Sequence, residues 1–229
     1  MKNRTVRSAV VLLSGGLDSA ATLYIAKRDG FKCFCLIFDY GQRHKREIDS
    51  ARRIALAAHS PYKIIKLNFP RRGSSLLDKS KKIPLVTKSG GHKVTSIPST
   101  YVPARNIIFL SFALSYAESL GASALYIGAH TQDYSGYPDC RMSFFRAFDK
   151  VISAGTRSGV EKRRLRIKAP LINKSKAQII RLASRLGVDF ALTWSCYRGG
   201  RAACGRCESC YFRARGFQEA GIKDPLIKK

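Results

Sequence analysis

The sequence is poor in acidic side chains and contains no long apolar run. Only 15 of its 229 residues are Asp or Glu, against 42 Lys and Arg, so the formal net charge is +27 at pH 7. No stretch approaches the roughly 18 apolar residues that a membrane-spanning helix needs, and the first residues show no signal-peptide cleavage site. These absences predict a cytoplasmic protein without a membrane partner.

The excess of positive charge has two interpretations. It favours polyanionic partners such as nucleotides or RNA, although charge concerns association and solubility rather than reaction. It also fits a basic, solvated surface produced by proteome-wide or thermal adaptation. Apolar residues make up 45% and charged residues 25%, as in ordinary globular proteins, which argues against wholesale disorder and a fibrous architecture.

Two common nucleotide-binding motifs are missing as well. No Gly-Lys-Ser/Thr follows the first glycines at Walker-loop spacing, and no Gly-x-Gly-x-x-Gly dinucleotide fingerprint is present. Both absences argue against ordinary nucleoside triphosphate hydrolysis and hydride transfer. The chain also shows no internal repeat, so its length fits one main α/β domain, alone or with a small appendage.

Apolar runs alternate with helical stretches along the chain, which predicts a parallel sheet. Strands are expected over residues 8–13, 33–38, 62–67 and 124–128, and helices over 18–29, 46–59, 104–120, 141–154, 174–186 and 208–220. Between them lie a long basic loop at about 68–100 and a basic connector over 157–168. The predicted fold is α/β, with a Rossmann-like parallel sheet of about five strands flanked by helices.

A glycine turn joins the first strand to the first helix, in the string Ser14-Gly15-Gly16-Leu17-Asp18-Ser19. Glycines let the backbone approach an anion closely, and the free amides and dipole of the helix start attract it. Ser14 and Ser19 can donate to phosphate oxygens, and Asp18 can hold Mg²⁺. A bare Ser-Gly-Gly turn can also be a simple helix entry. The full string resembles the PP-loop of N-type ATP pyrophosphatases, which adenylate carbonyl or carboxyl groups and release pyrophosphate.

Four of the seven cysteines crowd near the C-terminus as Cys196, Cys204, Cys207 and Cys210, in the pattern Cys-x7-Cys-x2-Cys-x2-Cys. In a reducing compartment this spacing suggests four thiolates around one tetrahedral Zn²⁺, and a site filled by protein ligands is structural. An iron–sulfur cluster or unrelated cysteines are the alternatives. We expect residues 1–187 to form an ATP-binding α/β domain and residues 188–229 to form a zinc-binding segment packed on it.

Two further segments carry candidate ligand-binding groups. Residues 133–141 bring carboxylates, tyrosines, a thiol and a guanidinium just beyond the strand over 124–128, at the sheet edge where α/β proteins bind ligands. Residues 101–106 open a helix, and Arg105 can reach an anion near its start. An ordinary surface turn and a generic charged first turn are the respective alternatives.

Five stretches together resemble the 7-cyano-7-deazaguanine synthase (QueC) family, over nearly the whole chain and in the family's order. They are residues 13–19, 38–44, 101–106, 133–141, and 193–196 with the cysteines that follow. The resemblance implies an adenine nucleotide alpha hydrolase-like fold and an ATP-dependent C–N ligase. The implied reaction activates 7-carboxy-7-deazaguanine with ATP, forms the amide with ammonia, and dehydrates the amide to the nitrile through a second activation, for queuosine- or archaeosine-type tRNA modification.

The resemblance also implies the site residues. ATP binding is expected of Leu13, Ser14, Gly15, Gly16, Leu17, Asp18, Ser19, Ala20, Phe38 and Arg105. Substrate binding is expected of Tyr40, Gln42, Arg43, His44, Asp133, Ser135, Gly136, Tyr137, Asp139 and Arg141. Asp18, Arg105 and Asp133 are the expected catalytic residues, and ATP, Mg²⁺ and a structural Zn²⁺ are the expected cofactors. The expected partners are a deazapurine and ammonia, while a homodimer and an RNA contact through the basic surface stay open.

The chain departs from the family pattern at three places. Met142-Ser143-Phe144 replaces the usual Pro-Glu-Phe, the first cysteine gap is one residue shorter, and Gly128-Ala129-His130 replaces an asparagine-containing triplet. Together with the net charge, these differences leave open a PP-loop paralogue that acts on a deazaguanine or another base within tRNA. A non-enzymatic zinc module that binds nucleic acid is a third hypothesis, and the intact phosphate loop argues against it.

Overall fold

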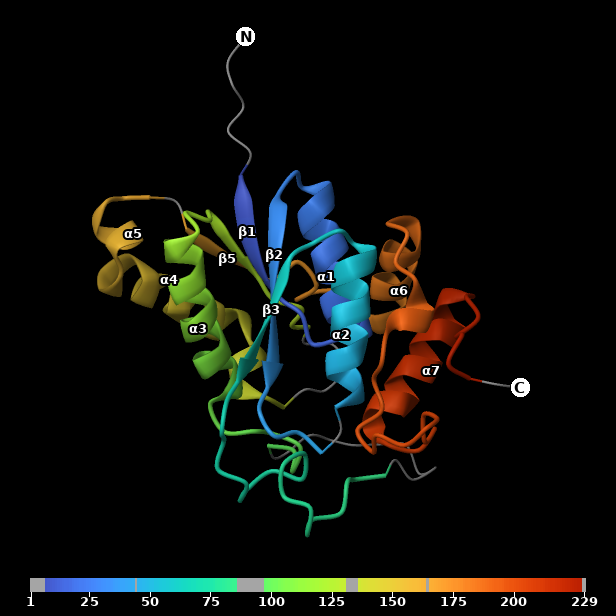
Figure 1. Cartoon of the computed structure of the whole chain (residues 1–229). Coiled ribbons are helices and arrows are strands. Elements are labelled where there is room, and N and C mark those ends of the chain that lie inside the picture. The colour runs from blue at the N-terminus through green and yellow to red at the C-terminus, as the bar shows by residue number, and fades with distance from the viewer. Residues whose placement is uncertain (1–6, 44, 86–96, 131–135, 164, 228–229) are drawn as a thin grey trace.

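Five parallel strands form the centre of the computed structural model, which describes residues 7–43, 45–85, 97–130, 136–163 and 165–227. The strands are β1 Ser8–Leu12, β2 Lys32–Asp39, β3 Tyr62–Lys66, β4 Ala124–Tyr126 and β5 Arg166–Lys168. Their order in the sheet is β3-β2-β1-β4-β5, so β1 is central (Figure 1). The chain therefore extends from β1 first to one side and later to the other. Open α/β sheets bind ligands at such a reversal, beyond the carboxyl ends of the strands.

Helices cover both faces of the sheet (Figure 1). The longer ones are α1 Leu17–Arg28, α2 Arg46–Ala57, α3 Arg105–Ser119, α4 Met142–Gly155, α6 Lys176–Arg185 and α7 Glu208–Ala220. The buried residues of α1, α2, α6 and α7 form one hydrophobic cluster with the sheet, and those of α3 and α4 form a second cluster on the opposite face. The predicted arrangement of a parallel sheet flanked by helices is confirmed.

The central strand β1 is apolar after Ser8 because the sheet is covered on both faces. Side chains alternate between the two faces of a strand, so Ala9 and Val11 pack with α1 and α2, whereas Val10 and Leu12 pack with α3 and α4. All four are buried. This alternation places the carboxyl end of β1, and the glycine turn that follows it, between the two helical layers.

Most predicted elements are confirmed to within a few residues, and the connector over 157–168 is the exception. It contains the short helix α5 Arg157–Val160 and the edge strand β5. The sequence of β5 is Arg-Ile-Lys, and its residues are only partly buried or exposed. A strand of this kind lacks the apolar run of a buried parallel strand, which is why the sequence did not reveal it.

The described part of the long basic loop packs against the C-terminal segment. Leu76 and Leu77 join the cluster under α3. Ile83 contacts the cluster formed by Trp194 and the cysteines, and Leu85 forms an isolated antiparallel bridge with Cys207. Residues 86–96 of the same predicted loop lie outside the described residues.

The C-terminal segment folds back onto the glycine turn, since the Trp194 amide donates to the Gly15 carbonyl at 2.8 Å. A 3₁₀ turn, Phe190–Leu192, precedes this contact, and another, Pro138–Cys140, precedes α4. The division into domains 1–187 and 188–229 stays a prediction. Within the described ranges, no helix has the length and apolar character needed to cross a bilayer.

Candidate active site

The glycine turn between β1 and α1 is held by hydrogen bonds between its two serines. Ser14 donates from its amide and its hydroxyl to Ser19 Oγ, at 3.2 and 3.1 Å, and the Ser19 hydroxyl donates to the Gly16 carbonyl at 3.0 Å. Gly15 has a φ of +83°, and a Cβ added there would lie 2.1 Å from the Glu47 carbonyl oxygen. Only glycine fits at this position, so the turn packs directly against the first turn of α2.

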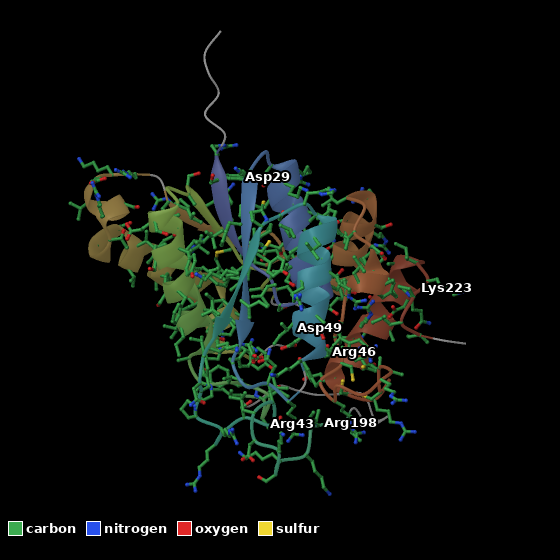
Figure 2. The ribbon with its side chains drawn as sticks, in the orientation of Figure 1. Asp29, Arg43, Arg46, Asp49, Arg198 and Lys223 are labelled. Carbon is green, nitrogen blue, oxygen red and sulfur yellow. The ribbon has the colours of Figure 1, made fainter. Side chains whose placement is uncertain are left out.

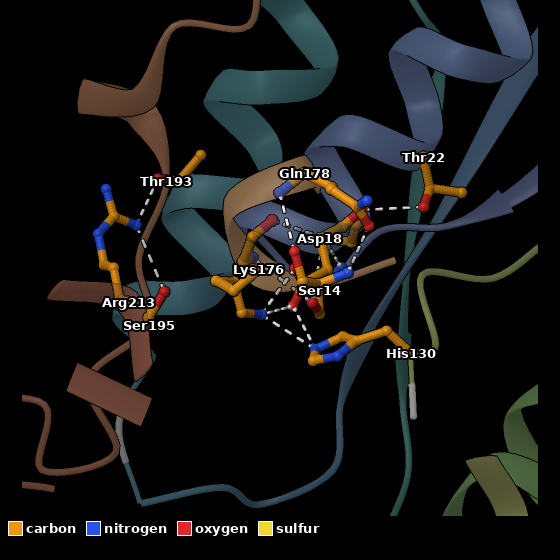
Figure 3. Close-up of polar contacts among 12 residues, drawn as sticks. Ser14, Asp18, Thr22, His130, Lys176, Gln178, Thr193, Ser195 and Arg213 are labelled. Carbon is orange, nitrogen blue, oxygen red and sulfur yellow. Dashed lines mark hydrogen bonds and ion pairs between the residues drawn. The ribbon is translucent and has the colours of Figure 1, made fainter. Parts of the chain in front are cut away.

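An aspartate, a lysine and a histidine from three parts of the chain meet beside this turn (Figure 3). Lys176 Nζ lies 2.9 Å from both carboxylate oxygens of Asp18 and 3.0 Å from His130 Nε2, which lies 3.4 Å from Asp18 Oδ2. Burial alone would raise the pKa of Asp18, but the charges and hydrogen bonds of Lys176 and His130 hold it well below its ordinary value. The ionised carboxylate therefore keeps a charged amine beside the glycine turn.

Lys176 was not predicted as a site residue, although the sequence around it carries a helix-start signal. The Ser175 hydroxyl accepts from the Gln178 amide at 3.2 Å, and the Gln178 side chain accepts from the Ser175 amide at 2.9 Å. This capping box starts α6 beyond β5, at the edge of the sheet where ligands bind. A Cβ added to Gly216 would lie 2.3 Å from Lys176 Cγ, so the stem of the lysine is packed against α7.

A single cavity of about 330 Å³ contains the glycine turn and extends to the start of α7. Its volume falls at the lower end of the range for small-molecule sites, roughly 300–1,000 Å³. Besides the glycine turn, its lining includes Phe38, Tyr40, Gln42, Arg43, Glu47, Arg105, Asn106, Phe109, His130, Tyr137, Cys140, Lys176, Trp194, Ser195, Tyr197, Glu208, Ser209, Phe212 and Arg213. These side chains come from both helical layers and from the C-terminal segment.

Arg105 lies at the start of α3 with its guanidinium among aromatic rings. Its Nη1 lies 3.5 Å from the Tyr40 hydroxyl, and its Cζ lies 5.9 Å from the centre of the Tyr40 ring and 6.0 Å from that of Phe109. Burial raises the pKa of Tyr40 to about 12; the nearby Glu47 charge also raises it, and the Arg105 charge opposes both. The phenol stays neutral, so it does not neutralise the charge that Arg105 offers to an anionic ligand.

Several cavity residues were not predicted from the sequence, among them Glu47, Tyr197, Glu208 and Phe212. Glu47 lies in the first turn of α2 and Glu208 is the first residue of α7. An acidic residue in the first turn of a helix is favoured by the helix dipole wherever the helix lies. The sequence therefore gave no sign that these two carboxylates face a cavity.

The predicted site residues fall into three groups. Those that line the cavity are Leu13, Ser14, Gly16, Leu17, Asp18, Ser19, Phe38, Tyr40, Gln42, Arg43, Arg105 and Tyr137. Those that are described but do not contribute to its lining are Gly15, Ala20, Gly136, Asp139 and Arg141. Asp139 is buried, and its carboxylate accepts from the Asn106 amide at 3.1 Å. His44, Asp133 and Ser135 lie outside the described residues, and the roles of all these residues stay predictions.

The four C-terminal cysteines converge on one point. The Sγ atoms of Cys196, Cys204, Cys207 and Cys210 all lie within 4.8 Å of one another. The Cys204 amide donates to Cys196 Sγ at 3.4 Å, and the Cys207 amide donates to Cys204 Sγ at 3.3 Å. Four thiolates this close fit a tetrahedral Zn²⁺ and leave no position for a substrate. Because Cys207 directly precedes α7 and Cys210 lies within it, the cluster holds the helix whose first turn lines the cavity.

Comparison with known proteins identifies the family. The family described as "Queuosine biosynthesis protein QueC" matches residues 8–221. The chain belongs to the QueC family. A curated relative from Anaeromyxobacter sp. (strain Fw109-5), named 7-cyano-7-deazaguanine synthase, is 48% identical over 230 residues, which cover 99% of this chain and 98% of the relative. A relative of the same name from Stutzerimonas stutzeri (strain A1501) is 50% identical over 224 residues, or 96% and 97% of the two chains. The resemblance seen in the sequence is confirmed.

A solved structure with a related fold supports the architecture of this QueC chain. The NMN synthetase from Francisella tularensis aligns with a TM-score of 0.52 and 14% sequence identity, covering 96% of this chain and 90% of that one. At this identity the likeness shows the fold alone. It agrees with the Rossmann-like parallel sheet and flanking helices described above.

Proposed function

We propose that this chain is an ATP-dependent 7-cyano-7-deazaguanine synthase, which converts 7-carboxy-7-deazaguanine and ammonia to the nitrile. A carboxylate is a poor electrophile, so ATP first adenylates it with release of pyrophosphate, and ammonia then displaces AMP to give the amide. A second adenylation, on the amide oxygen, provides the leaving group for nitrile formation. Relatives of this name match nearly the whole chain at 48% and 50% identity, which supports the proposal.

One observation carries this proposal: the glycine turn shares its cavity with a group of tyrosines around Arg105. Ser14, Ser19 and Lys176 offer hydroxyls and an amine to phosphates beside the turn. Tyr137 and Arg105 line the same cavity and offer an aromatic ring and a guanidinium. Transfer of an adenylyl group to a carboxylate on a heterocycle needs both reactants in one enclosure, where the reacting atoms can be held in line.

The proposed roles follow this division of the cavity. The turn over residues 14–19 binds the phosphates of ATP through its amides and hydroxyls, with Lys176 beside it. Arg105 binds a phosphate or the substrate carboxylate, for which its planar guanidinium is suited. Residues 133–141 bind the deazapurine, and Tyr137 is the described residue of that segment whose ring lines the cavity. Catalytic roles for Asp18 and Asp133 belong to the same proposal.

The proposed cofactors are ATP, Mg²⁺ and the structural zinc. Both carboxylate oxygens of Asp18 lie 2.9 Å from Lys176 Nζ, so this carboxylate fits a magnesium ion only after the amine has turned toward the phosphates. Magnesium bound to ATP would neutralise part of the charge on the departing pyrophosphate. A cytoplasmic location, a homodimer and a place in queuosine- or archaeosine-type tRNA modification stay parts of the prediction.

Mass spectrometry of the purified, zinc-loaded protein tests the proposal. Incubation with Mg-ATP, ammonium and 7-carboxy-7-deazaguanine should yield 7-cyano-7-deazaguanine and AMP. Omission of ammonium serves as the control and should abolish the nitrile. Absence of both products from a folded, zinc-bound sample would contradict the proposal.

The net charge of +27 favours a second candidate, a PP-loop enzyme that acts on a base within tRNA. Exposed cations lie on the loops whose carbonyls accept from Arg43 and Arg46, including Lys81, Lys82, Arg198 and Arg201. The same incubation with tRNA in place of the free base distinguishes the candidates. A modified nucleoside in the digested tRNA, without conversion of the free carboxylate, would favour the second one.

A further inference from the structure

The roles assigned so far include no base that takes protons from the substrate nitrogen. The inference below rests on that proposed function. An ammonium ion must lose four protons before its nitrogen becomes the nitrogen of a nitrile: two when the amide forms, and two when the adenylated amide eliminates AMP. A base near the acyl carbon is therefore needed in both halves of the reaction.

Most titratable groups in the cavity are unsuited to this task. Arg105 and Lys176 are cations. Asp18 is a weak base, because its pairing with Lys176 and His130 outweighs its burial and holds its pKa well below the ordinary value. Burial raises the pKa of Tyr40 to about 12, so this phenol already holds its proton at neutral pH. The Nε2 atom of His130 already lies 3.0 Å from Lys176 Nζ and 3.4 Å from Asp18 Oδ2, so it is engaged with this charge pair.

Two other carboxylates line the cavity within the described residues, Glu47 and Glu208. Glu208 starts α7 beside the cysteine cluster, and its charge acts on Tyr137 and Tyr197. It therefore belongs to the part of the cavity that we assign to the heterocycle. Glu47 instead lies beside the glycine turn that we assign to ATP.

The packing of α2 places Glu47 against the ATP-binding turn. The Glu47 carbonyl oxygen approaches Gly15 so closely that no side chain fits between them. Glu47 is among the residues that line the cavity containing this turn, and its charge acts on Tyr40 of the same lining. Asp49 lies two residues further along α2 (Figure 2). Its side chain is exposed instead and pairs with Arg52 at 3.9 Å. The two carboxylates of this helix turn thus have different surroundings.

The backbone after β2 orients the partner of Glu47. The Tyr40 amide donates to Gln42 Oε1 at 2.8 Å, and Gln42 Nε2 donates to the Phe38 carbonyl at 3.2 Å. With its amide fixed at both ends, Gln42 is close enough to Glu47 to lower the pKa of that carboxyl. Arg105 of α3 adds a positive charge close enough to act on the carboxylate.

The surroundings of Glu47 bring its pKa into the range that suits a general base near neutral pH. Burial raises its pKa to about 7, although the Arg105 charge and the Gln42 side chain oppose the rise. Tyr40 is the titratable neighbour in the loop after β2, and Arg46 of the same helix stacks over Trp194 at 4.1 Å. A group with this pKa is ionised often enough to accept a proton and basic enough to hold it.

We infer that Glu47 is the general base that takes protons from the substrate nitrogen. In the first half, Glu47 takes a proton from ammonium, the freed lone pair forms the C–N bond at the acyl adenylate, and the C–O bond breaks as AMP leaves. A second N–H proton then departs to give the amide. In the second half, Glu47 takes an N–H proton from the adenylated amide, the N–H electrons form a C–N π bond, and AMP leaves again. Loss of the last proton completes the nitrile, and Glu47 returns its protons to solvent between transfers.

The variant Glu47→Gln tests this inference by separating adenylation from the steps at nitrogen. Exchange of labelled pyrophosphate into ATP, driven by the carboxylate without ammonia, should stay within about twofold of wild type. Amide formation from ammonium should fall by about 10²–10⁴-fold, the usual contribution of general base catalysis. Hydroxylamine, which is unprotonated at neutral pH, needs no deprotonation before attack. The loss of hydroxamate formation in the variant, relative to wild type, should therefore be smaller than the loss of amide formation by a factor of at least about ten.

The pH profile is the second readout, because a merely structural role would not change it. In the wild type, kcat for amide formation should rise with pH through a value near 7, since Glu47 must be ionised to accept a proton. The Glu47→Gln variant should lose this acidic limb, and Glu47→Asp should keep it at a reduced rate. Asp49→Asn is the matched control in the same helix turn and should behave as wild type.

The outcomes separate this inference from the proposed function. If wild-type protein shows no pyrophosphate exchange with the carboxylate, the proposed function fails and the inference fails with it. If wild type is active, amide formation by folded Glu47→Gln at the wild-type rate, with an unchanged pH profile, would overturn the inference alone. Loss of pyrophosphate exchange in the same folded variant would also overturn it, because Glu47 would then act in adenylation or in holding the turn.

Discussion

At the scale of single residues, the charge beside the glycine turn depends on one lysine. Lys176 Nζ lies at hydrogen-bonding distance from both oxygens of Asp18, and its side chain is only 13% exposed. The pair presents an ammonium group next to free amides and hydroxyls. The ammonium group can form charge-assisted hydrogen bonds with the phosphates of ATP, while Asp18 holds it in place.

Replacement of this lysine should weaken ATP binding without unfolding the protein. We expect Lys176→Met to raise the Kd for ATP by roughly 10–100-fold, because a hydrogen bond to a charged group contributes about 1.5–3 kcal/mol. Isothermal titration calorimetry with Mg-ATP measures the change. Lys174→Met, two residues earlier, removes a lysine that does not line the cavity and should leave the Kd unaltered. Equal affinities for wild type and Lys176→Met would show that Lys176 does not face the phosphates.

The sequence predicted one half of this charge pair and missed the other. Asp18 belongs to a local motif, whereas Lys176 lies 158 residues away and reaches Asp18 only through the packing of α6 and α7 against the sheet. Glu47 was missed for a similar reason, since its carboxylate faces the cavity only because Gly15 lets α2 approach the turn. Residues that only tertiary packing brings together have no regular spacing along the chain. A single sequence therefore cannot show that they belong to one site.

At the scale of elements, α7 is tied to the rest of the chain by a buried ion pair. Arg213 donates to both carboxylate oxygens of Asp224, at 2.8 and 3.0 Å, and the two side chains are 6% and 4% exposed. The same guanidinium donates to Thr193 Oγ1 at 2.8 Å, and its approach to Thr193 and Ser195 is visible in Figure 3. Arg213 thus joins α7 to the chain ahead of the four-cysteine cluster and to the C-terminal residues.

Breaking this pair should be costly for stability. Asp224→Asn leaves the buried guanidinium without its counter-charge, which typically lowers the free energy of unfolding by about 3–5 kcal/mol. Chemical denaturation measures this difference. The control is Glu219→Gln, which breaks the exposed pair with Arg215 and should cost no more than about 1 kcal/mol. A loss below about 1 kcal/mol for Asp224→Asn would contradict the buried pairing.

The zinc cluster should stabilise the same region and the cavity next to it. Removal of zinc with a chelator, or the substitution Cys207→Ser, should release the first turn of α7 and the loop that Leu85 joins to Cys207. We expect the Tm to fall by roughly 6–12 °C, as a loss of about 3 kcal/mol predicts for a chain of this size. Differential scanning calorimetry with and without added zinc measures the shift, and zinc should restore the chelated wild type but not the variant. An unchanged Tm after full zinc removal would contradict a structural role.

Elements with strong apolar patterns were predictable, and the others were not. The four residues of β1 after Ser8 are apolar and buried, so the sequence located this strand to within one residue. The edge strand β5 has one apolar residue in three, and only its pairing with β4 makes it a strand. The long loop was predicted as a loop, but the packing of Ile83 on Trp194 and the cysteines depends on contacts between distant segments.

At the scale of the whole molecule, the positive charge should raise the rate at which anionic ligands associate with the protein. Arg43 hydrogen-bonds to the carbonyls of Asp78 and Lys81, and Arg46 donates to the Gly200 carbonyl at 2.7 Å. These contacts join the segment after β2 to the loops around residues 78–82 and 198–201. Arg43, Arg46 and Arg198 of these parts lie at the same end of the molecule in Figure 2, which is the end that holds the cavity. A surface of this kind attracts ATP, carboxylates and RNA alike.

Added salt should therefore lower the rate at which ATP binds more than it lowers the rate of the chemical steps. Between about 50 and 500 mM NaCl the Debye length shrinks from above 10 Å to a few Å, and kcat/KM for ATP should fall by about 3–10-fold while kcat changes little. The double variant Lys81→Glu/Lys82→Glu should show a shallower salt dependence. A salt-independent kcat/KM would favour adaptation as the origin of the charge. Tight tRNA binding with a steep salt dependence would favour an RNA partner.

The central claim is that one cavity activates the substrate twice with ATP, first at the carboxylate and then at the amide oxygen. The stoichiometry of products per nitrile tests it most directly, measured by quantitative mass spectrometry with ¹⁵N-ammonium. The account predicts two AMP and two pyrophosphate per nitrile, with ¹⁵N in the nitrile, and a single AMP when the amide is supplied as substrate. Formation of ADP and phosphate, or of one AMP per nitrile from the carboxylate, would contradict it.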